Sequence, residues 1–141
     1  MMVGWAGTMA IALAPLGAHA QESTEELVAA NATRLNKDEL QALVSGSRAE
    51  YISGRGTFFG YEHAADGTLS GYLTNAMGAR GANSPGRGTW RITGDGQYCI
   101  DSVWGRSQPT DVKWCAPVYK LGSDYFFVYK TLKPVKVAFK K

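Results

Sequence analysis

The chain has 141 residues, a net charge of +3, 11% aromatic residues, 17 glycines and two cysteines. This length is enough for one domain and excludes an array of several domains. The charge is too mild to indicate a nucleic-acid partner. Abundant glycine and aromatic residues are typical of a sheet protein with many turns.

The chain opens with an apolar stretch at residues 3–17, followed by Ala18, His19 and Ala20. Two small residues in this spacing are typical of a signal-peptidase site, and the stretch is shorter than the ~20 apolar residues of a membrane-spanning helix. Because no Lys or Arg precedes the stretch, a retained anchor is the alternative. We expect residues 1–20 to be a cleaved signal peptide and the mature chain to be periplasmic.

Residues 21–47 are predicted to be the helical part of the chain. Asn36 followed by Glu39 is typical of a helix N-cap with a capping box, and Gly46 is a natural stop. Residues 24–33 fit a looser first helix.

Residues 48–141 are predicted to form a β domain of seven or eight short strands. The expected strands lie at residues 55–64, 68–74, 89–93, 97–104, 112–120, 125–130 and 135–140. Asp66 with Gly67 is a strong hairpin signal, and residues 78–88 are expected to be one long irregular loop. Such an antiparallel meander is expected to curl into a small lipocalin-like barrel or a sandwich, with the helix at its N-terminus.

The charges are unevenly distributed along the mature chain. Residues 112–141 hold seven lysines and one acid, or +6, whereas residues 21–111 hold eight basic residues and eleven acids, or −3. A basic C-terminal end is complementary to anionic lipid headgroups or polysaccharide. Lysines that protect exposed edge strands are the alternative interpretation.

Cys99 and Cys115 lie in two matching strand-like segments. If they face each other, an opposite-charge pair and an apolar pair result: Asp101 with Lys113, and Ile100 with Trp114. A shift of one residue would invert the faces. In an oxidising compartment we expect a structural disulfide that stabilises the fold by ~3 kcal/mol. A redox or metal-binding pair is the alternative.

The chain resembles a known family on several short motifs. These are Gly88-Thr-Trp90, Asp95-Gly-Gln-Tyr-Cys99, Trp104, Trp114-Cys115, Tyr119-Lys120 and Leu35-Asn-Lys-Asp-Glu-Leu40. They are similar to small exported proteins of Gram-negative bacteria that are defined only as a domain of unknown function. The resemblance covers about 100 residues from Leu35 onward. It implies a periplasmic, lipocalin-like or barrel fold and brings no known activity.

Catalytic motifs are sparse in the mature chain. His63 is its one histidine and follows Glu62, so an envelope hydrolase or isomerase using these two residues is one hypothesis. No zinc-ligand spacing or phosphate-loop ending is present, and we expect no metal and no cofactor. A protein-interaction or inhibitory module acting through residues 78–88 is a second alternative.

The preferred hypothesis is a non-enzymatic protein that binds a small anionic or amphiphilic ligand, or an envelope partner. Long loops on a rigid scaffold are frequent recognition sites, and here they carry Arg80, Arg87 and Arg106. Arginines at one rim suit a carboxylate or phosphate, and Trp104 and Trp114 would supply apolar contact beneath them. Arginines that only solvate the loops are the alternative interpretation.

Overall fold

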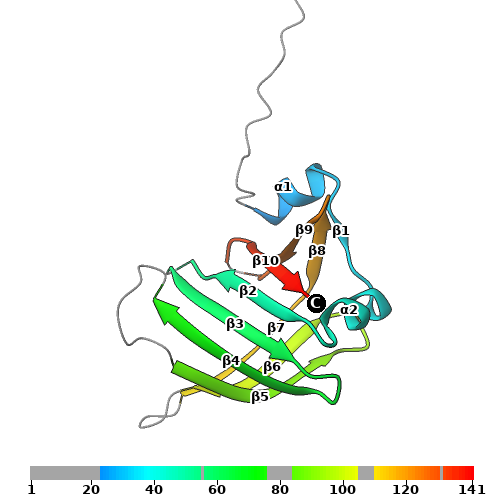
Figure 1. The fold of residues 1–141 in the computed structure, drawn as a ribbon. Coiled ribbons are helices and arrows are strands. Elements are labelled where there is room, and N and C mark those ends of the chain that lie inside the picture. Colours follow the sequence, from blue (N-terminus) through cyan, green and yellow to red (C-terminus); the bar gives the residue numbers. More distant parts are fainter. Residues whose placement is uncertain (1–22, 55, 76–83, 105–109, 131) are drawn as a thin grey trace, which may run out of the picture.

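The computed structural model describes residues 23–54, 56–75, 84–104, 110–130 and 132–141. These residues form one curled antiparallel sheet, a half-barrel, with two short helices beside it (Figure 1). The helices are α1 (Thr24–Ala29) and α2 (Lys37–Val44). The strands are β1 (Thr33–Arg34), β2 (Arg48–Ile52), β3 (Thr57–His63), β4 (Thr68–Asn75), β5 (Ser84–Ile92), β6 (Tyr98–Trp104), β7 (Thr110–Ala116), β8 (Val118–Leu121), β9 (Asp124–Phe127) and β10 (Val135–Lys140). The predicted mainly β architecture is confirmed.

The sheet follows the predicted meander over most of its width. Strands β2 to β7 pair in chain order, and β8, β9 and β10 add three more antiparallel neighbours. The closing strand β10 pairs with β2, with Val137 opposite Tyr51. The order of the described strands is therefore β1-β8-β9-β10-β2-β3-β4-β5-β6-β7, a single curled sheet rather than two stacked ones.

Helix α2 begins at the predicted capping box. The Asn36 side chain accepts a hydrogen bond from the Glu39 backbone at 2.8 Å, and the Glu39 carboxylate accepts one from the Asn36 backbone at 2.9 Å. The helix ends at Val44, and Gly46 follows with a φ of +73°. A positive φ is readily adopted only by glycine, which explains why the helix stops here.

Two predicted segments are wrong. Residues 112–120 are not one strand, because Pro117 has no N–H to donate and separates β7 from β8. Residues 84–88, expected to be loop, belong to β5. A Cβ atom on Gly86 would lie 2.7 Å from the Trp104 ring, and one on Gly88 would lie 2.0 Å from the Asp101 carbonyl oxygen. These glycines therefore permit close strand packing rather than a flexible loop.

The predicted disulfide and its register are confirmed. Cys99 and Cys115 are bonded across β6 and β7, with a Cα–Cα distance of 4.1 Å. Ile100 lies opposite Trp114, as expected from the sequence. The Lys113 ammonium lies 3.5 Å from the Asp101 carboxylate on the same strand pair.

Replacing both cysteines with serine is expected to lower the free energy of unfolding by about 3 kcal/mol while preserving the fold. The bond joins residues 16 positions apart, so its loss frees a short loop in the unfolded chain. Urea denaturation of the oxidised wild type and the double variant measures the difference. Equal stability of the two proteins would contradict this account.

The two ends of the half-barrel differ. At one end, α2 lies against the tight turns: the Gly46 amide donates to the His63 carbonyl at 2.8 Å, and the Arg34 guanidinium donates to the Asp95 carbonyl at 2.8 Å. We call this the α2 end. Strands β2 and β6 end at the opposite end, where β3, β7 and β10 begin. We call that opposite end the distal end.

None of the helices in the described residues is long and apolar enough to cross a membrane. Helix α1 instead packs on the β8–β9 hairpin, where the buried Leu27 forms a small cluster with Phe126 and Val128. The main core lies inside the curl of the sheet, under α2.

Candidate functional site

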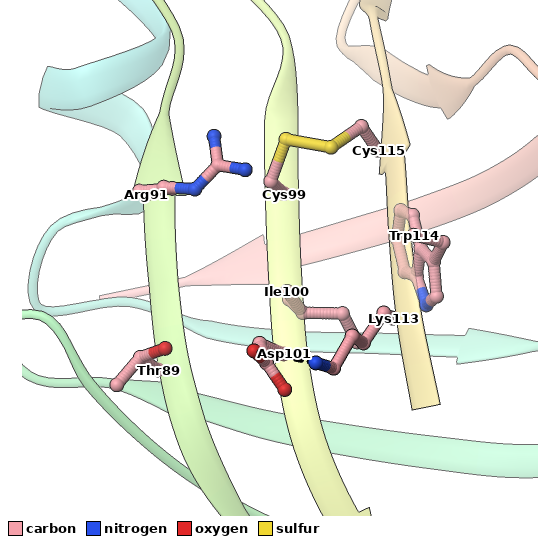
Figure 2. A pocket seen from close by; sticks show the side chains of 8 residues that line it. All are labelled: Thr89, Arg91, Cys99, Ile100, Asp101, Lys113, Trp114 and Cys115. Carbon is pink, nitrogen blue, oxygen red and sulfur yellow. Dashed lines mark ion pairs between the residues drawn. A yellow bond between two sulfur atoms is a disulfide. The ribbon is translucent and has the colours of Figure 1, made fainter. Parts of the chain in front are cut away.

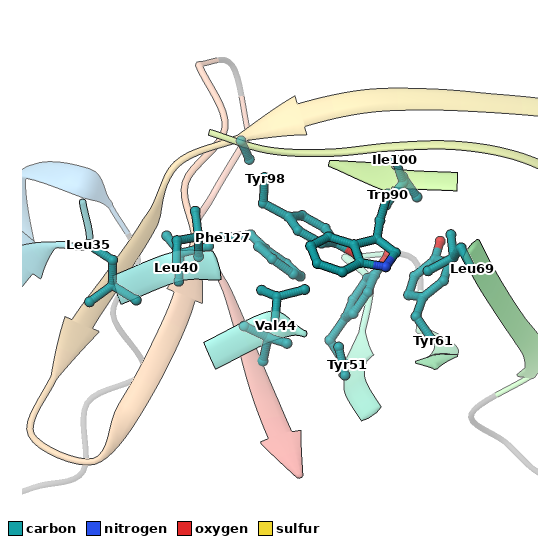
Figure 3. Close-up of a cluster of buried hydrophobic side chains, with 14 of the residues drawn as sticks. Leu35, Leu40, Val44, Tyr51, Tyr61, Leu69, Trp90, Tyr98, Ile100 and Phe127 are labelled. Atoms are coloured by element: carbon teal, nitrogen blue, oxygen red, sulfur yellow. The ribbon is translucent and has the colours of Figure 1, made fainter. Parts of the chain in front are cut away.

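The inner face of the half-barrel carries most of the aromatic side chains. Residues directly opposite each other on paired strands point to the same face, so the register assigns each ring. The inward rings are Tyr51, Phe59, Tyr61, Trp90, Tyr98, Trp104, Trp114, Tyr125, Phe127 and Phe139. Figure 3 shows several of them turned toward one another inside the curl. The inner face is therefore an aromatic surface.

The α2 end of this surface is closed. Leu40 and Val44 of α2 are fully buried against it, beside Trp90 and Tyr98 (Figure 3). The indole N–H of Trp90 donates to the Ala64 carbonyl at 2.9 Å, which fixes the ring over the β3–β4 turn. A buried indole needs such a partner. This end has the character of a structural core.

His63 is buried next to this core and both of its ring nitrogens have partners. Nδ1 lies 3.1 Å from the Ser47 carbonyl oxygen, and Nε2 lies 2.6 Å from the Tyr98 hydroxyl. Because a carbonyl only accepts, Nδ1 carries the proton and Nε2 accepts from Tyr98. Burial lowers the pKa of His63 to about 4, against the opposing effect of the Ser47 hydrogen bond. His63 is thus a neutral structural histidine at pH 7.

Further along the inner face lies a group of tyrosine hydroxyls. Burial, followed by the neighbouring Tyr61 hydroxyl, raises the pKa of Tyr51 far above its usual range. Burial also raises the pKa of Tyr61 to about 12, although the Tyr51 and Trp114 side chains act in the opposite direction. No hydrogen bond of ordinary geometry reaches the buried Tyr61 hydroxyl, although the Tyr51 and Trp114 side chains lie close enough to lower its pKa by hydrogen bonding. Hydroxyls buried without a well-formed hydrogen bond are costly.

The tyrosine group extends toward solvent through Tyr129, which is half-buried. Burial and then the Tyr61 hydroxyl raise the pKa of Tyr129, so these two hydroxyls lie near each other. The Tyr129 ring also packs against Trp114, with centroids 5.5 Å apart. We call Tyr51, Tyr61 and Tyr129 the tyrosine cluster.

Part of the inner face, at Phe59 and beside strand β7, is only half-buried. Phe59 packs edge-to-face against the buried Trp104, with centroids 5.8 Å apart, and Trp104 donates to the Ser102 hydroxyl at 2.8 Å. Phe59, Trp114 and Tyr129 all contact the core but keep part of their surface exposed. Aromatic rings that line a concave surface and remain accessible are typical of ligand sites. These three rings and the tyrosine cluster form the candidate site.

The residues proposed from the sequence for a rim site are divided by the structure. Trp104 and Trp114 lie on the inner face, as expected for residues beneath a rim. Arg87 is exposed and pairs with the exposed Val103, which places it on the outer face. Arg80 and Arg106 lie outside the described residues. The three-arginine site stays a prediction.

The two residues of the enzyme hypothesis both border one outer cleft of about 540 Å³, which also includes Arg48 and Lys140. Glu62 and His63 are consecutive on β3, however, so their side chains point to opposite faces, and the His63 ring is buried. Arg48 and Lys140 already pair with the Glu50 carboxylate, at 2.9 and 2.8 Å. This geometry gives no support to Glu62 and His63 acting as a catalytic pair.

A second hollow lies over the disulfide on the outer face. It measures about 330 Å³ and is lined by residues of β5, β6 and β7: Thr89, Arg91, Cys99, Ile100, Asp101, Lys113, Trp114 and Cys115. Figure 2 shows the Arg91 guanidinium turned toward the disulfide and the ion pair between Asp101 and Lys113. Cys99 is buried and Cys115 is exposed. The hollow is small, and its charges are mixed.

Side chains that could bind a metal ion are scattered over the part of the chain that the structure describes. Within these residues no three His, Cys, Asp or Glu side chains come together as a metal-binding group.

Comparison with known proteins gives one family. Residues 10–116 match the model of a family described as "Protein of unknown function (DUF995)". The chain belongs to this family. The DUF995 match begins upstream of Leu35 and ends with β7, so it includes the disulfide but excludes Tyr119 and Lys120. No curated protein and no solved structure matches the chain.

Sequence reasoning missed the tyrosine cluster. Phe59, Tyr61 and His63 recur at every second position of β3, which is the signal that places them on one face. Tyr51 was missed because no strand was predicted over residues 48–52, where the structure has β2. Its contact with Phe59, at 5.1 Å between ring centroids, becomes evident only from the strand pairing.

Proposed function

We propose that the protein is a non-enzymatic periplasmic binding protein that holds a small amphiphile on its inner face. The observation that carries this proposal is the partial exposure of aromatic rings on that face. The rings under α2 are buried, whereas Phe59 toward the distal end, and Trp114 and Tyr129 beside the last strand of the sheet, β7, are half-exposed. A ligand that covers these rings would remove exposed aromatic surface from water.

The tyrosine cluster favours a ligand that carries a hydrogen-bonding group. Its hydroxyls sit among aromatic rings, and the Tyr61 hydroxyl makes no hydrogen bond of ordinary geometry. Tyr129 is the member that reaches solvent. A carboxylate or another acceptor group on the ligand would receive hydrogen bonds from these hydroxyls. The chemical class is therefore an apolar body with one small polar or anionic group.

The disulfide supports the proposed compartment. Disulfides persist in oxidising compartments such as the bacterial periplasm. Cys99 and Cys115 are bonded across a regular strand pair, which suits a structural bond. This agrees with an exported chain.

The test uses the fluorescent amphiphile N-phenyl-1-naphthylamine with purified wild-type protein. Its fluorescence is expected to rise on binding and to fall when laurate competes. Phe59→Ala is expected to weaken binding about tenfold, since the variant loses one ring contact. Phe58→Ala is the matched control, because Phe58 is the next residue on β3, is also half-buried and points outward.

Both variants are first compared by near-ultraviolet circular dichroism, which reports the packing of the aromatic core. Tyr129→Ala serves as a second inner-face variant if Phe59→Ala is poorly folded. Equal weakening by the Phe58 and Phe59 substitutions would contradict an inner-face site. Absence of saturable probe binding to the wild type would contradict the proposed function itself.

A further inference from the structure

Large exposed apolar side chains gather at the distal end. Within the described residues, four such side chains are exposed: Val28, Ile52, Val103 and Leu132, at 55%, 56%, 39% and 66%. Single exposed apolar residues are common and need no explanation. Here, however, three of the four lie at the same end of the half-barrel. Only Val28, on α1, lies elsewhere.

The strand pairing fixes the positions of these three residues. Ile52 is the last residue of β2, and Val103 is the penultimate residue of β6. Leu132 precedes β10, whose first residues run beside the end of β2, because Val137 pairs with Tyr51. Ile52, Val103 and Leu132 are the distal rim. They lie at the end of the inner face at which Phe59 is half-exposed.

The rim residues are directed away from the core. Ile52 pairs with Phe58, which is half-buried on the outer face of β3. Val103 pairs with the exposed Arg87. Rim side chains of this kind are free to contact another surface without opening the core.

Basic residues lie beside two of these apolar positions. Lys130 and Lys133 lie on either side of Leu132 in the sequence, and both are exposed. Arg87 lies beside Val103 on one strand, and the exposed Asp111 lies beside it on the other. Among the described neighbours of Leu132 and Val103, these three cations outnumber the single acid. Apolar and basic residues together are the composition that binds anionic membrane surfaces.

We propose that the distal rim docks on an anionic lipid bilayer, so that an amphiphile passes between the bilayer and the inner face. This inference rests on the proposed function for the passage of the ligand, but the docking itself is measured separately. A bilayer is favoured over a protein partner because the apolar residues stand apart, on β2, on β6 and in the segment before β10, with exposed cations beside Leu132 and Val103. A protein interface would require a continuous apolar patch.

The experiment is flotation of the full-length mature protein with vesicles. Wild type is expected to float with vesicles of phosphatidylcholine and phosphatidylglycerol and to remain at the bottom with phosphatidylcholine alone. The double variant I52D/L132D is expected to lose at least nine-tenths of the bound fraction. V28D is the matched control, because Val28 is as exposed as Ile52 and lies on α1.

A second pair of variants tests the charges. K130Q/K133Q is expected to weaken binding to anionic vesicles at least tenfold, since each lysine near such a surface contributes favourably. K37Q/K120Q removes the same charge from exposed positions outside the rim and is expected to retain wild-type binding. Both double variants should bind N-phenyl-1-naphthylamine in solution like the wild type.

Several results would overturn docking at the rim. These are absence of wild-type flotation with anionic vesicles, equal flotation with neutral ones, or equal losses in V28D and I52D/L132D. Failure of the proposed function is distinguishable from these results. In that case the probe would not bind in solution, while flotation and its dependence on the rim residues would be unaffected.

Discussion

Replacing Trp104 with alanine is expected to lower the free energy of unfolding by about 3–5 kcal/mol. The ring is 4% exposed and packs edge-to-face against both Phe59 and Tyr61, with centroids 5.8 and 5.5 Å apart. Gly86 provides the space for this ring on β5. The substitution would leave a cavity in the centre of the half-barrel and would leave the Ser102 hydroxyl without its indole donor.

Urea denaturation of Trp104→Ala measures this loss, and Val103→Ala is the control. Val103 is the preceding residue on β6 but points outward and is 39% exposed, so its truncation is expected to cost less than about 1 kcal/mol. The account would be contradicted if Trp104→Ala kept wild-type stability and lost only probe binding. Trp104 would then be a ligand contact rather than a core residue.

Acidification from pH 7 to pH 4 is expected to cost about 3 kcal/mol of stability through His63 alone. Its pKa is about 4 in the folded protein and 6.5 as the ordinary value, and each pKa unit corresponds to about 1.4 kcal/mol. Because the folded pKa is the lower one, the unfolded chain binds the proton first. Stability is therefore full above pH 6.5 and falls as the pH drops toward 4.

The physical cause is the burial of the ring, which makes the charged form costly. A proton on Nε2 would oppose the Tyr98 hydroxyl, which now donates to that nitrogen from 2.6 Å. Denaturation at several pH values compares wild type with His63→Gln, which does not titrate. The variant is expected to be less stable at pH 7 and to show a flatter dependence between pH 4 and 6.5. Identical slopes for the two proteins would exclude His63 as the cause.

Local sequence signals predicted the features that depend on neighbouring residues. The pairing of Cys99 with Cys115 followed from two strand-like segments and one opposite-charge pair, Asp101 with Lys113, and the observed register agrees. The capping box at Asn36 was also readable, because its partner Glu39 lies only three residues away. Such contacts can be predicted without knowing how distant segments of the chain pack.

Features that depend on packing between distant strands were not readable in the same way. The glycines of residues 84–88 indicated a loop, yet Gly86 faces Trp104 from a neighbouring strand. Composition cannot distinguish a flexible glycine from one that makes room for a ring. The candidate site shows the same limit: Trp104 and Trp114 were recognised as aromatic candidates, whereas the grouping of Tyr51 with Tyr61 required the pairing of β2 with β3.

The central claim is that an amphiphile binds the inner face toward the distal end. Its most direct test is a nuclear magnetic resonance titration of the mature protein with laurate, followed at the indole N–H signals of Trp90, Trp104 and Trp114. The account predicts saturable shifts for Trp114 and Trp104, and an unchanged Trp90 signal, since Trp90 is 5% exposed and held by Ala64 at the α2 end. A shift confined to Trp90, or no saturable shift in any of the three signals, would contradict it.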